Sequence, residues 1–338
     1  MILNVGRQIL DLTLLDMEQN EIQKDKSYFQ VAEGVWGLTD IFTNVYVIRN
    51  DADNSWVLID AGLKTGYGKI KKMVGDLFGE NARPSAILLT HGHFDHTGSL
   101  KKLAEEWDVP VYAHYLELPY LQGKSAYPPP DPSVGGGLMS YFSEFYPKHS
   151  ADVIDRVGAF PGIGHDVPGL PEWKYMHTPG HSPGHVSFWR EKDKVLIAGD
   201  AFVTTVAESA FSVMTQSKII SGPPKYFTCN WLEAESSVEM LASLLPEVVA
   251  TGHGKPMNGK EMQQELLELA YYFQEQAVPK KGRYVMSPAI TDSQGVVSLP
   301  KEGSNPVEVF LTISAAAAVA AIGIALYARF KNERSYRL

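Results

Sequence analysis

Cysteine is nearly absent from this sequence, and basic residues are outnumbered by acidic ones. The single cysteine, Cys229, excludes intramolecular disulfides and any metal site built from several thiolates. Lysine and arginine total 30 against 39 aspartates and glutamates, which gives a formal charge of −9 over 338 residues. Binding to phosphate backbones requires a basic surface, so nucleic acid is excluded as a general partner. A hydrophobic content of 44% with 20% charged residues indicates a folded protein with a substantial core.

A secretory signal is also missing from the first residues, whereas the last part of the sequence contains a long uncharged run. Arg7 and Asp11 interrupt the apolar stretch that a cleavable signal needs. Residues 309–328 carry no charge, and at about 1.5 Å per residue a helix of this length spans the roughly 30 Å of a bilayer core. We therefore predict a transmembrane helix over 307–328; its eight alanines are also compatible with a buried core helix.

The flanks of this run give conflicting indications of its orientation. Four basic residues follow it in the tail 329–338, whereas Lys301 is the only basic residue in the eighteen before it. The positive-inside rule would keep this tail in the cytoplasm and place the large N-terminal part outside. Because that part has no export signal, we favour a cytoplasmic domain on a single-pass C-terminal membrane anchor.

Short apolar runs and helical periodicities divide the rest of the sequence. β-Branched and aromatic runs predict strands over 29–38, 43–49, 56–60, 86–90, 111–113, 186–189, 195–198 and 248–251. Apolar spacing predicts helices over 66–79, 97–107, 231–245 and 261–276. This alternation predicts an α/β layered sandwich over 27–278, after an extension over 1–26. The stretch 116–173 is too long for an ordinary connection and is predicted to be an insertion or lid, and 279–306 has the composition of a linker.

Histidine and aspartate are concentrated in one turn that follows a predicted strand. His91, His93 and His96, three of the chain's ten histidines, fall within six residues, and Asp95 lies among them. Imidazole and carboxylate groups are natural ligands of zinc or iron in hydrolytic centres. A tight turn can direct His91 and His93 to one metal and Asp95 and His96 to another. The alternative is a polar loop that is rich in histidine by chance, and the density of ligand types counts against it.

Three further candidate ligands lie in turns or beside strand ends. His181 lies in a turn rich in proline and glycine, Asp200 follows the strand over 195–198, and His253 follows the strand over 248–251. Taken singly, such an aspartate is more often a helix cap and such a histidine an ordinary turn residue. Together with the first four residues they provide five imidazoles and two carboxylates, which is what two metal ions bridged by a carboxylate and a hydroxide require.

In this order and spacing, the seven residues resemble the metal site of the metallo-β-lactamase superfamily, and the resemblance covers roughly residues 27–278. It implies a four-layer αβ/βα sandwich with the site at one edge. It also implies three roles for the ligands: a first metal held by His91, His93 and His181, a second metal held by Asp95, His96 and His253, and a bridge between the two by Asp200.

Other polar residues near the predicted site are assigned supporting roles. Asp60 resembles the upstream strand-end aspartate of the family, which orients the metal loop from behind the ligands. His114, His177 and His185 are not needed as ligands, and we interpret them as residues behind the ligands or as buried core histidines. Cys229 has no histidine-rich surroundings and is interpreted as structural.

The resemblance implies hydrolysis as the reaction. It implies two divalent metal ions, for which zinc is the preferred choice and manganese or iron the alternatives. Zinc lowers the pKa of bound water from about 15.7 to about 7. The bridging hydroxide attacks a carbonyl or phosphoryl centre, and Asp95 or Asp200 relays the proton to the leaving group. Asp200 counts against a β-lactam substrate, since antibiotic-cleaving relatives usually lack the bridging aspartate. Val203 stands where the best-known lactonase relatives have tyrosine. We predict cleavage of an ester, thioester or lactone of a small molecule.

Aromatic and methionine side chains in 116–173 and in the loop 202–231 favour an apolar acyl or aryl substrate, unless they only pack the insertion onto the sandwich. In the loop these side chains are Phe202, Phe211, Met214, Phe227 and Trp231. Two other functions remain as alternatives. A mononuclear iron dioxygenase of the persulfide-oxidising type predicts one iron per chain and oxygen uptake. A membrane-tethered binding protein with a vestigial site is opposed by the complete set of seven ligands.

Overall fold

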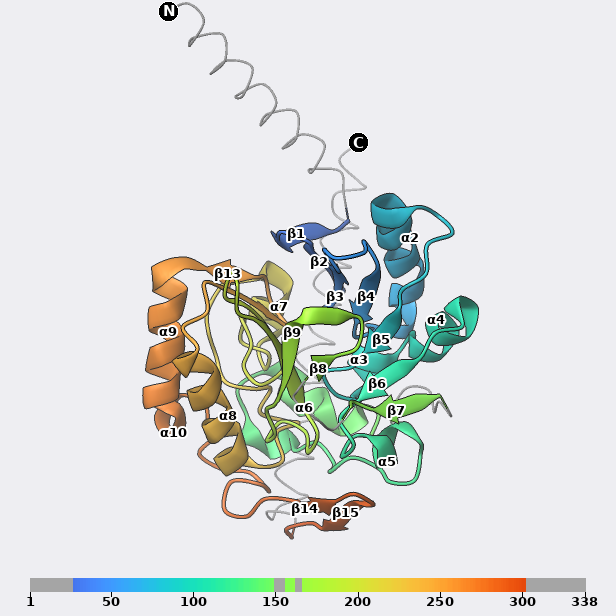
Figure 1. The fold of residues 1–338 in the computed structure, drawn as a ribbon. Helices are drawn as coiled ribbons and strands as arrows, with labels where there is room; N and C mark the ends of the chain where they lie inside the picture. The colour runs from blue at the N-terminus through green and yellow to red at the C-terminus, as the bar shows by residue number, and fades with distance from the viewer. Residues whose placement is uncertain (1–26, 149–155, 162–165, 302–338) are drawn as a thin grey trace, which may run out of the picture.

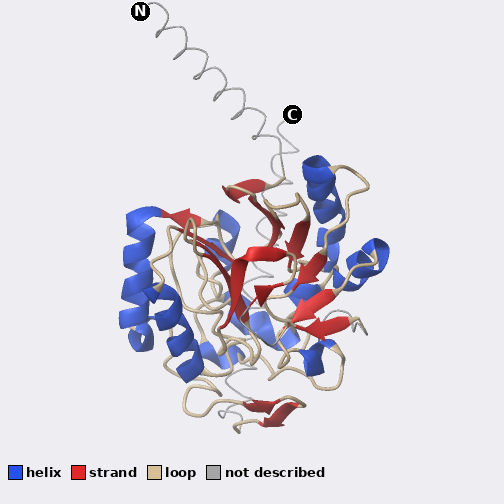
Figure 2. Ribbon diagram, viewed as in Figure 1, coloured by secondary structure: helices blue, strands red, loops and turns tan. Residues whose placement is uncertain are grey.

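The computed structural model describes residues 27–148, 156–161 and 166–301. Two β-sheets lie face to face in the centre of this part of the chain, and helices cover the outer face of each sheet (Figure 1 and Figure 2). The predicted α/β sandwich is therefore confirmed. The order helix, sheet, sheet, helix buries the apolar faces of both sheets.

The first sheet has seven strands in the order β1-β2-β3-β4-β5-β6-β7. They are β1 (Phe29–Ala32), β2 (Val35–Asp40), β3 (Thr43–Arg49), β4 (Trp56–Ile59), β5 (Ala86–Leu88), β6 (Val111–Ala113) and β7 (Val157–Ala159). Strands β1 to β4 pair antiparallel, and β4 to β7 pair parallel. The parallel connections carry η1 (Lys64–Gly66), α2 (Tyr67–Phe78), α3 (Phe94–Thr97) and α4 (Leu100–Trp107), of which α2 and α4 cover the outer face.

The second sheet has six strands in the order β13-β12-β11-β10-β9-β8. They are β8 (Asp166–Val167), β9 (Leu170–His177), β10 (Val186–Arg190), β11 (Val195–Gly199), β12 (Val248–Thr251) and β13 (Met257–Asn258). Only β11 and β12 pair parallel. Between β11 and β12 lie α7 (Ala210–Thr215) and α8 (Trp231–Ser243), and α9 (Gly259–Tyr271) and α10 (Phe273–Gln276) follow β13. Helices α8 and α9 cover the outer face of this sheet (Figure 1).

Strand β11 shows why the central strands have apolar residues at nearly every position. Val195 and Ile197 face the first sheet, whereas Leu196 and Ala198 belong to the core beneath α8 and α9. Successive side chains of a strand point to opposite faces, so a strand that is covered on both sides needs apolar residues at every position. These continuous apolar runs are the strands that the sequence predicts with nearly the observed bounds.

The stretch 116–173, predicted as an insertion or lid, is partly made of sheet strands. Strand β7 forms an edge of the first sheet, and β8 with the start of β9 belongs to the second sheet. The short helices α5 (Leu118–Leu121), η2 (Pro132–Val134), α6 (Leu138–Phe142) and η3 (Ser143–Phe145) precede β7 and lie between β6 and β7. The sequence does not predict β9, because Glu172 and Lys174 interrupt its apolar residues at exposed positions.

The predicted linker 279–306 packs against the domain as far as residue 301, so that prediction is wrong for its described part. Tyr284 and Ala289 are buried in the core that α8 and α9 cover. A hairpin of β14 (Ile290–Asp292) and β15 (Gly295–Ser298) follows. Lysine, glycine and proline give the start of this segment a linker-like composition, but the apolar residues after it cover the domain surface.

No helix among the described residues is long and apolar enough to cross a membrane. The predicted span 307–328, the basic tail 329–338 and the extension 1–26 lie outside the described residues.

Candidate metal centre

The predicted metal loop, residues 90–98, leaves the end of β5 and turns into the single helical turn α3. Its four candidate ligands are all buried, with exposed fractions between 0% and 5%. His93 has an extended backbone just before α3, whereas Asp95 and His96 lie within the turn. The candidate donors nevertheless form overlapping groups: His91 lies with His96 and Asp200 in one of them, with the His91 and His96 rings 4.2 Å apart between centroids, and two further groups share its members.

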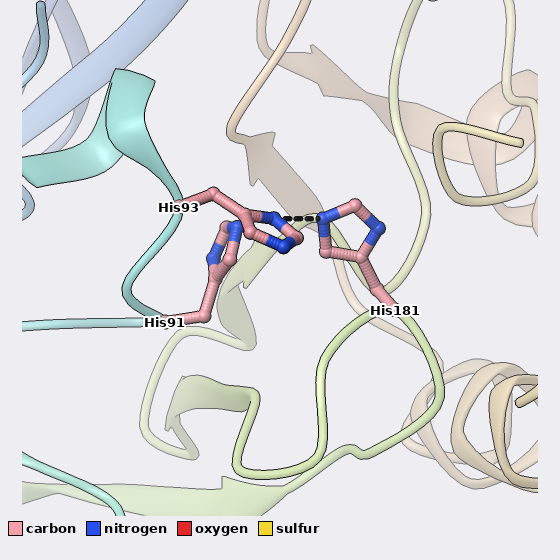
Figure 3. A group of neighbouring side chains, drawn as sticks. All are labelled: His91, His93 and His181. Carbon is pink, nitrogen blue, oxygen red and sulfur yellow. Dashed lines mark hydrogen bonds between the residues drawn. The ribbon is translucent and has the colours of Figure 1, made fainter. Parts of the chain in front are cut away.

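The first group contains His91, His93 and His181, whose side chains converge from two loops (Figure 3). Nδ1 of His93 lies 3.0 Å from Nε2 of His181. The ring of His91 lies 4.6 Å from that of His93 and 4.9 Å from that of His181, measured between centroids. One ligand atom from each residue lies within 4.8 Å of the others, so the three nitrogens can bind one ion.

The second group contains Asp95, His96 and His253. Oδ2 of Asp95 lies 3.8 Å from Nε2 of His96 and 3.5 Å from Nε2 of His253. His253 follows β12 at the same edge of the sandwich and donates from Nδ1 to the backbone oxygen of Phe42 at 2.8 Å. This hydrogen bond leaves Nε2 of His253 free to bind a metal.

Asp200 lies between the two groups. Its Oδ2 lies 3.4 Å from Nε2 of His181, 3.7 Å from Nε2 of His96 and 3.1 Å from Nε2 of His253. Close packing at this point requires glycine, since a Cβ on Gly252 would lie 2.0 Å from Oδ1 of Asp200. The structure therefore brings together all seven residues that the sequence suggests as ligands.

The donor set fits divalent metal ions. Among the described residues, Nε2 of His91, Nε2 of His96 and Oδ1 of Asp200 are buried and have no hydrogen-bond partner. Buried polar atoms without a partner are rare in folded proteins, and a bound cation would satisfy all three. Burial lowers the pKa of His93 to about 3 and keeps its imidazole neutral, as a metal ligand must be.

The charge balance in the second group also favours a cation. Burial opposes a charge on His96, but Asp95, Asp200 and Asp60 around it raise its pKa well above the usual value. Although burial also disfavours its ionised form, His253 and His96 hold the pKa of Asp200 well below the usual range. The carboxylates thus stabilise positive charge here, and a divalent ion would supply that charge.

Asp60 and His185 support the candidate ligands from behind. Asp60 follows β4 and accepts from Nδ1 of His96 at 2.8 Å and from the backbone and hydroxyl of Thr90 at 2.8 and 2.7 Å. Nε2 of His185 accepts from the backbone N–H of Asp200 at 2.9 Å, while Nδ1 donates to the oxygen of Thr178 at 3.1 Å. Such contacts fix the tautomer and the direction of a ligand.

His114 and His177 lie together and brace the loop that carries His181. Their rings stack with centroids 4.1 Å apart, and Nε2 of His177 donates to the backbone oxygen of Pro183 at 2.9 Å. Cys229 is buried beside the backbone oxygen of Gly180 at 3.6 Å, and burial raises the pKa of its thiol. These positions agree with supporting and structural roles.

Glu117 is a functional residue that the sequence analysis missed. It is fully buried and accepts from the backbone N–H groups of Gly92 at 2.9 Å and Gly184 at 2.7 Å, and from the hydroxyls of Ser182 at 2.9 Å and Tyr127. It therefore ties the metal loop to the loop that carries His181. Burial raises the pKa of this carboxyl, and the four donors offset part of the rise. Its place after a strand end was the available signal.

Aromatic side chains crowd over the candidate metal centre and leave a narrow cleft there, with a volume of about 10 Å³. Phe227 stacks on His93 with centroids 4.6 Å apart, and Phe42, Phe94 and Tyr146 line the same cleft. Of the loop residues expected in the pocket wall, Phe227 is there. Phe202 and Trp231 instead belong to the core, because they pack beneath α8 and α9.

Comparison with known proteins identifies the family. The model of the metallo-beta-lactamase superfamily matches residues 38–253, a range that contains all seven candidate ligands. The chain belongs to the metallo-β-lactamase superfamily. The probable metallo-hydrolase YflN of Bacillus subtilis is 46% identical to this superfamily member over 243 residues, which cover 72% of this chain and 92% of YflN. The protein is thus a metallo-hydrolase with a His/Asp cluster suited to divalent metals.

More distant similarities lie within the same superfamily. The hydroxyacylglutathione hydrolase GloC of Haemophilus influenzae is 24% identical over 157 residues, which cover 46% of this chain and 65% of GloC. The crystal structure of a beta-lactamase domain protein from Burkholderia ambifaria matches this metallo-hydrolase with a TM-score of 0.51 and 20% identity, over 73% of this chain and 76% of that chain. The latter likeness concerns the fold alone.

Proposed function

We propose that this metallo-hydrolase binds two divalent metal ions, preferably zinc, and cleaves an ester, thioester or lactone of a small apolar molecule. The position of Asp200 carries the proposal. Its Oδ2 lies 3.4 Å from His181 of the first group and 3.1 Å from His253 of the second. A carboxylate oxygen between two complete donor sets supports two ions that share a ligand.

The residues around the centre would have distinct roles. The three histidines of the first group would hold one ion, Asp95, His96 and His253 the other, and Asp200 would bind both. When bound, such ions lower the pKa of a water molecule toward neutrality and stabilise developing negative charge. Asp95 and Asp200 both line the cleft, which places carboxylate oxygens within reach of a leaving group that needs a proton.

The walls of the cleft and one relative support the choice of substrate. Phe42, Phe94 and Phe227 present apolar surface to any molecule that reaches the centre and exclude water from it. GloC is named for the hydrolysis of a hydroxyacylglutathione, which is an acyl thioester. An acyl ester or thioester satisfies both observations.

Metal analysis and turnover of an Asp200→Ala variant test the proposal. We expect two metal ions per purified wild-type chain and turnover of aryl esters, acyl thioesters or lactones. Asp200→Ala should remain folded, lose metal and lose hydrolysis. Asp131→Ala is the matched control, because Asp131 is also buried but accepts from Ser133 and from the backbone of Arg283 instead.

Three results would overturn the proposal. Undiminished hydrolysis by Asp200→Ala would exclude the shared carboxylate. One iron per chain together with oxygen uptake would indicate a mononuclear dioxygenase. A wild-type chain that binds no metal and turns over no substrate would indicate a binding protein.

We also propose that residues 307–328 anchor the protein in a membrane, with the catalytic domain in the cytoplasm. The uncharged composition of 309–328 supports this proposal. The full chain should sediment with membranes and resist extraction by high salt, whereas a chain that ends at residue 301 should remain in the supernatant. Sedimentation of both chains, or of neither, would contradict the anchor.

A further inference from the structure

An apolar groove leads away from the cleft over the candidate metal centre. Its volume is about 550 Å³. The turn between β2 and β3 contributes Ile41 and Phe42, α6 contributes Met139, and α7 contributes Val213 and Met214. The polar residues of its lining are Thr39, Gln216 and Lys255. Clefts of this size lined by hydrophobic side chains are typical sites for small molecules.

The groove adjoins the metal site. Phe42 and Met139 line both the groove and the cleft. Phe42 also touches the candidate ligands directly, since its backbone oxygen accepts from His253 at 2.8 Å and its ring stacks on that imidazole at 6.0 Å between centroids. A molecule bound at the metal centre can therefore extend along the groove.

The backbone at the rim of the groove indicates a functional reason for its apolar side chains. Ile41 has a φ of 62° and its side chain is 63% exposed. A β-branched residue in the left-handed region is strained, and glycine or asparagine is favoured in such a turn. Burial of the isoleucine side chain does not offset this strain. Strained residues cluster at functional sites, which favours a functional role for Ile41. Met214, which is 83% exposed, lies on the same groove.

We propose that the groove binds an unbranched acyl chain of the substrate, whose carbonyl end reaches the metal centre through the cleft. The proposal rests on the hydrolase function proposed above and specifies its substrate class. The walls that the two cavities share, at Phe42 and Met139, argue for the substrate as the occupant, since a molecule in the groove lies next to the metal site.

A series of thioesters or aryl esters with one leaving group and acyl chains from acetyl to decanoyl tests this inference on the metal-loaded full chain. For the wild type, kcat/KM should rise by about twofold to fourfold for each methylene that enters the groove. Met214→Glu and Ile41→Asn should flatten this rise and leave acetyl turnover unchanged. Phe211→Glu is the matched control, because Phe211 is 75% exposed on the same helix but does not line the groove.

Ile41→Asn separates recognition from folding. Asparagine tolerates the left-handed backbone, so this variant should be at least as stable as the wild type and yet lose the preference for long chains. Equal kcat/KM for all chain lengths in an active wild type would overturn the groove proposal alone. Loss of the preference in Phe211→Glu to the same degree would also overturn it. No turnover of any member of the series by the wild type would instead be a failure of the proposed hydrolase function.

Discussion

Replacing Glu117 should reduce both the stability of the fold and the affinity for metal, which replacing an ordinary buried carboxylate should not do. Its Oε1 accepts from Ser182 and from the N–H of Gly184, and its Oε2 accepts from the N–H of Gly92 and from Tyr127. Both oxygens are thus occupied by a backbone donor and a hydroxyl. A hydroxyl can rotate to a new partner, but a backbone N–H cannot.

The expected magnitudes follow from this count of donors. Glu117→Gln replaces one oxygen by an amide nitrogen, so one of the two backbone N–H groups, of Gly92 or of Gly184, loses its acceptor in either orientation. An unsatisfied buried donor costs about 1–3 kcal/mol. Glu117→Ala leaves both donors unsatisfied and should cost about 2–6 kcal/mol, a large part of the 5–15 kcal/mol that stabilises a typical domain.

Glu208 provides the matched control, because it is also buried and its Oε1 accepts from the backbone N–H of Lys225 at 2.7 Å. Glutamine at position 208 can keep its oxygen toward that donor, so Glu208→Gln should change stability by less than about 1 kcal/mol. Urea denaturation of the metal-free wild type and the three variants, followed by tryptophan fluorescence, measures these changes in stability.

Glu117→Gln should also weaken metal binding at the first group of ligands. Glu117 fixes the backbone between His91 and His93 and the loop that carries His181, so Glu117→Gln should lose about 10-fold to 100-fold in affinity for one of two ions. Chelator competition measures this loss. The reasoning is refuted if Glu117→Gln and Glu208→Gln are equally stable, or if both retain wild-type affinity.

Three further predictions test other parts of the structure. Asp60→Asn replaces one carboxylate oxygen by an amide nitrogen, so either Nδ1 of His96 or the backbone N–H of Thr90 loses its acceptor, and one metal site should weaken by about 10-fold to 100-fold, measured as metal per chain after dialysis against a chelator. Burial and the neighbouring His177 lower the pKa of His114 to about 3. Between about pH 6.5 and pH 3 only the unfolded chain binds a proton at this imidazole, so the free energy of unfolding should fall as the pH drops through this range. His114→Gln should then lose about 2 kcal/mol less than the wild type between pH 7.5 and pH 5 in urea denaturation, and an equal loss would contradict the assignment. A chain that ends at residue 278 should melt several degrees below one that ends at 301, because the buried ring of Tyr284 contributes about 1.5–3 kcal/mol, and equal melting temperatures would mean that this segment adds no stability.

The sequence predicts those elements whose residues are buried on both sides or follow a helical period. Strands β6 and β12 have the predicted bounds, and α2 differs from its prediction by one residue at each end. Strand β9 is missed because the strand predictions rest on uninterrupted apolar runs, whereas Glu172 and Lys174 interrupt the buried residues of β9. Strands β7 and β8 each contain a single β-branched residue, so no β-branched or aromatic run marks them in the sequence.

The candidate ligands could be predicted because so many metal-binding residue types lie close together in the sequence. The residues that hold these ligands in place could not be predicted in this way. Three histidines and an aspartate within six residues are dense enough to indicate a metal without any knowledge of the fold. Glu117 is one of many glutamates, and its role depends on donors as far away in the sequence as Gly184. The packing of Tyr284 is equally non-local, since its hydroxyl donates to the backbone oxygen of Pro129 at 2.7 Å.

One topological rule nevertheless accounts for both kinds of residue. Strands β4, β5 and β6 run parallel, as do β11 and β12, so the carboxyl ends within each set lie at one edge of its sheet. Asp60, His91 and Glu117 follow the first set, and Asp200 and His253 follow the second. Open α/β sheets bind ligands just beyond the carboxyl ends of their strands. A polar residue within about four positions of a predicted parallel strand is therefore a candidate for the site whatever its type, and this criterion would have selected Glu117 together with the ligands that it supports.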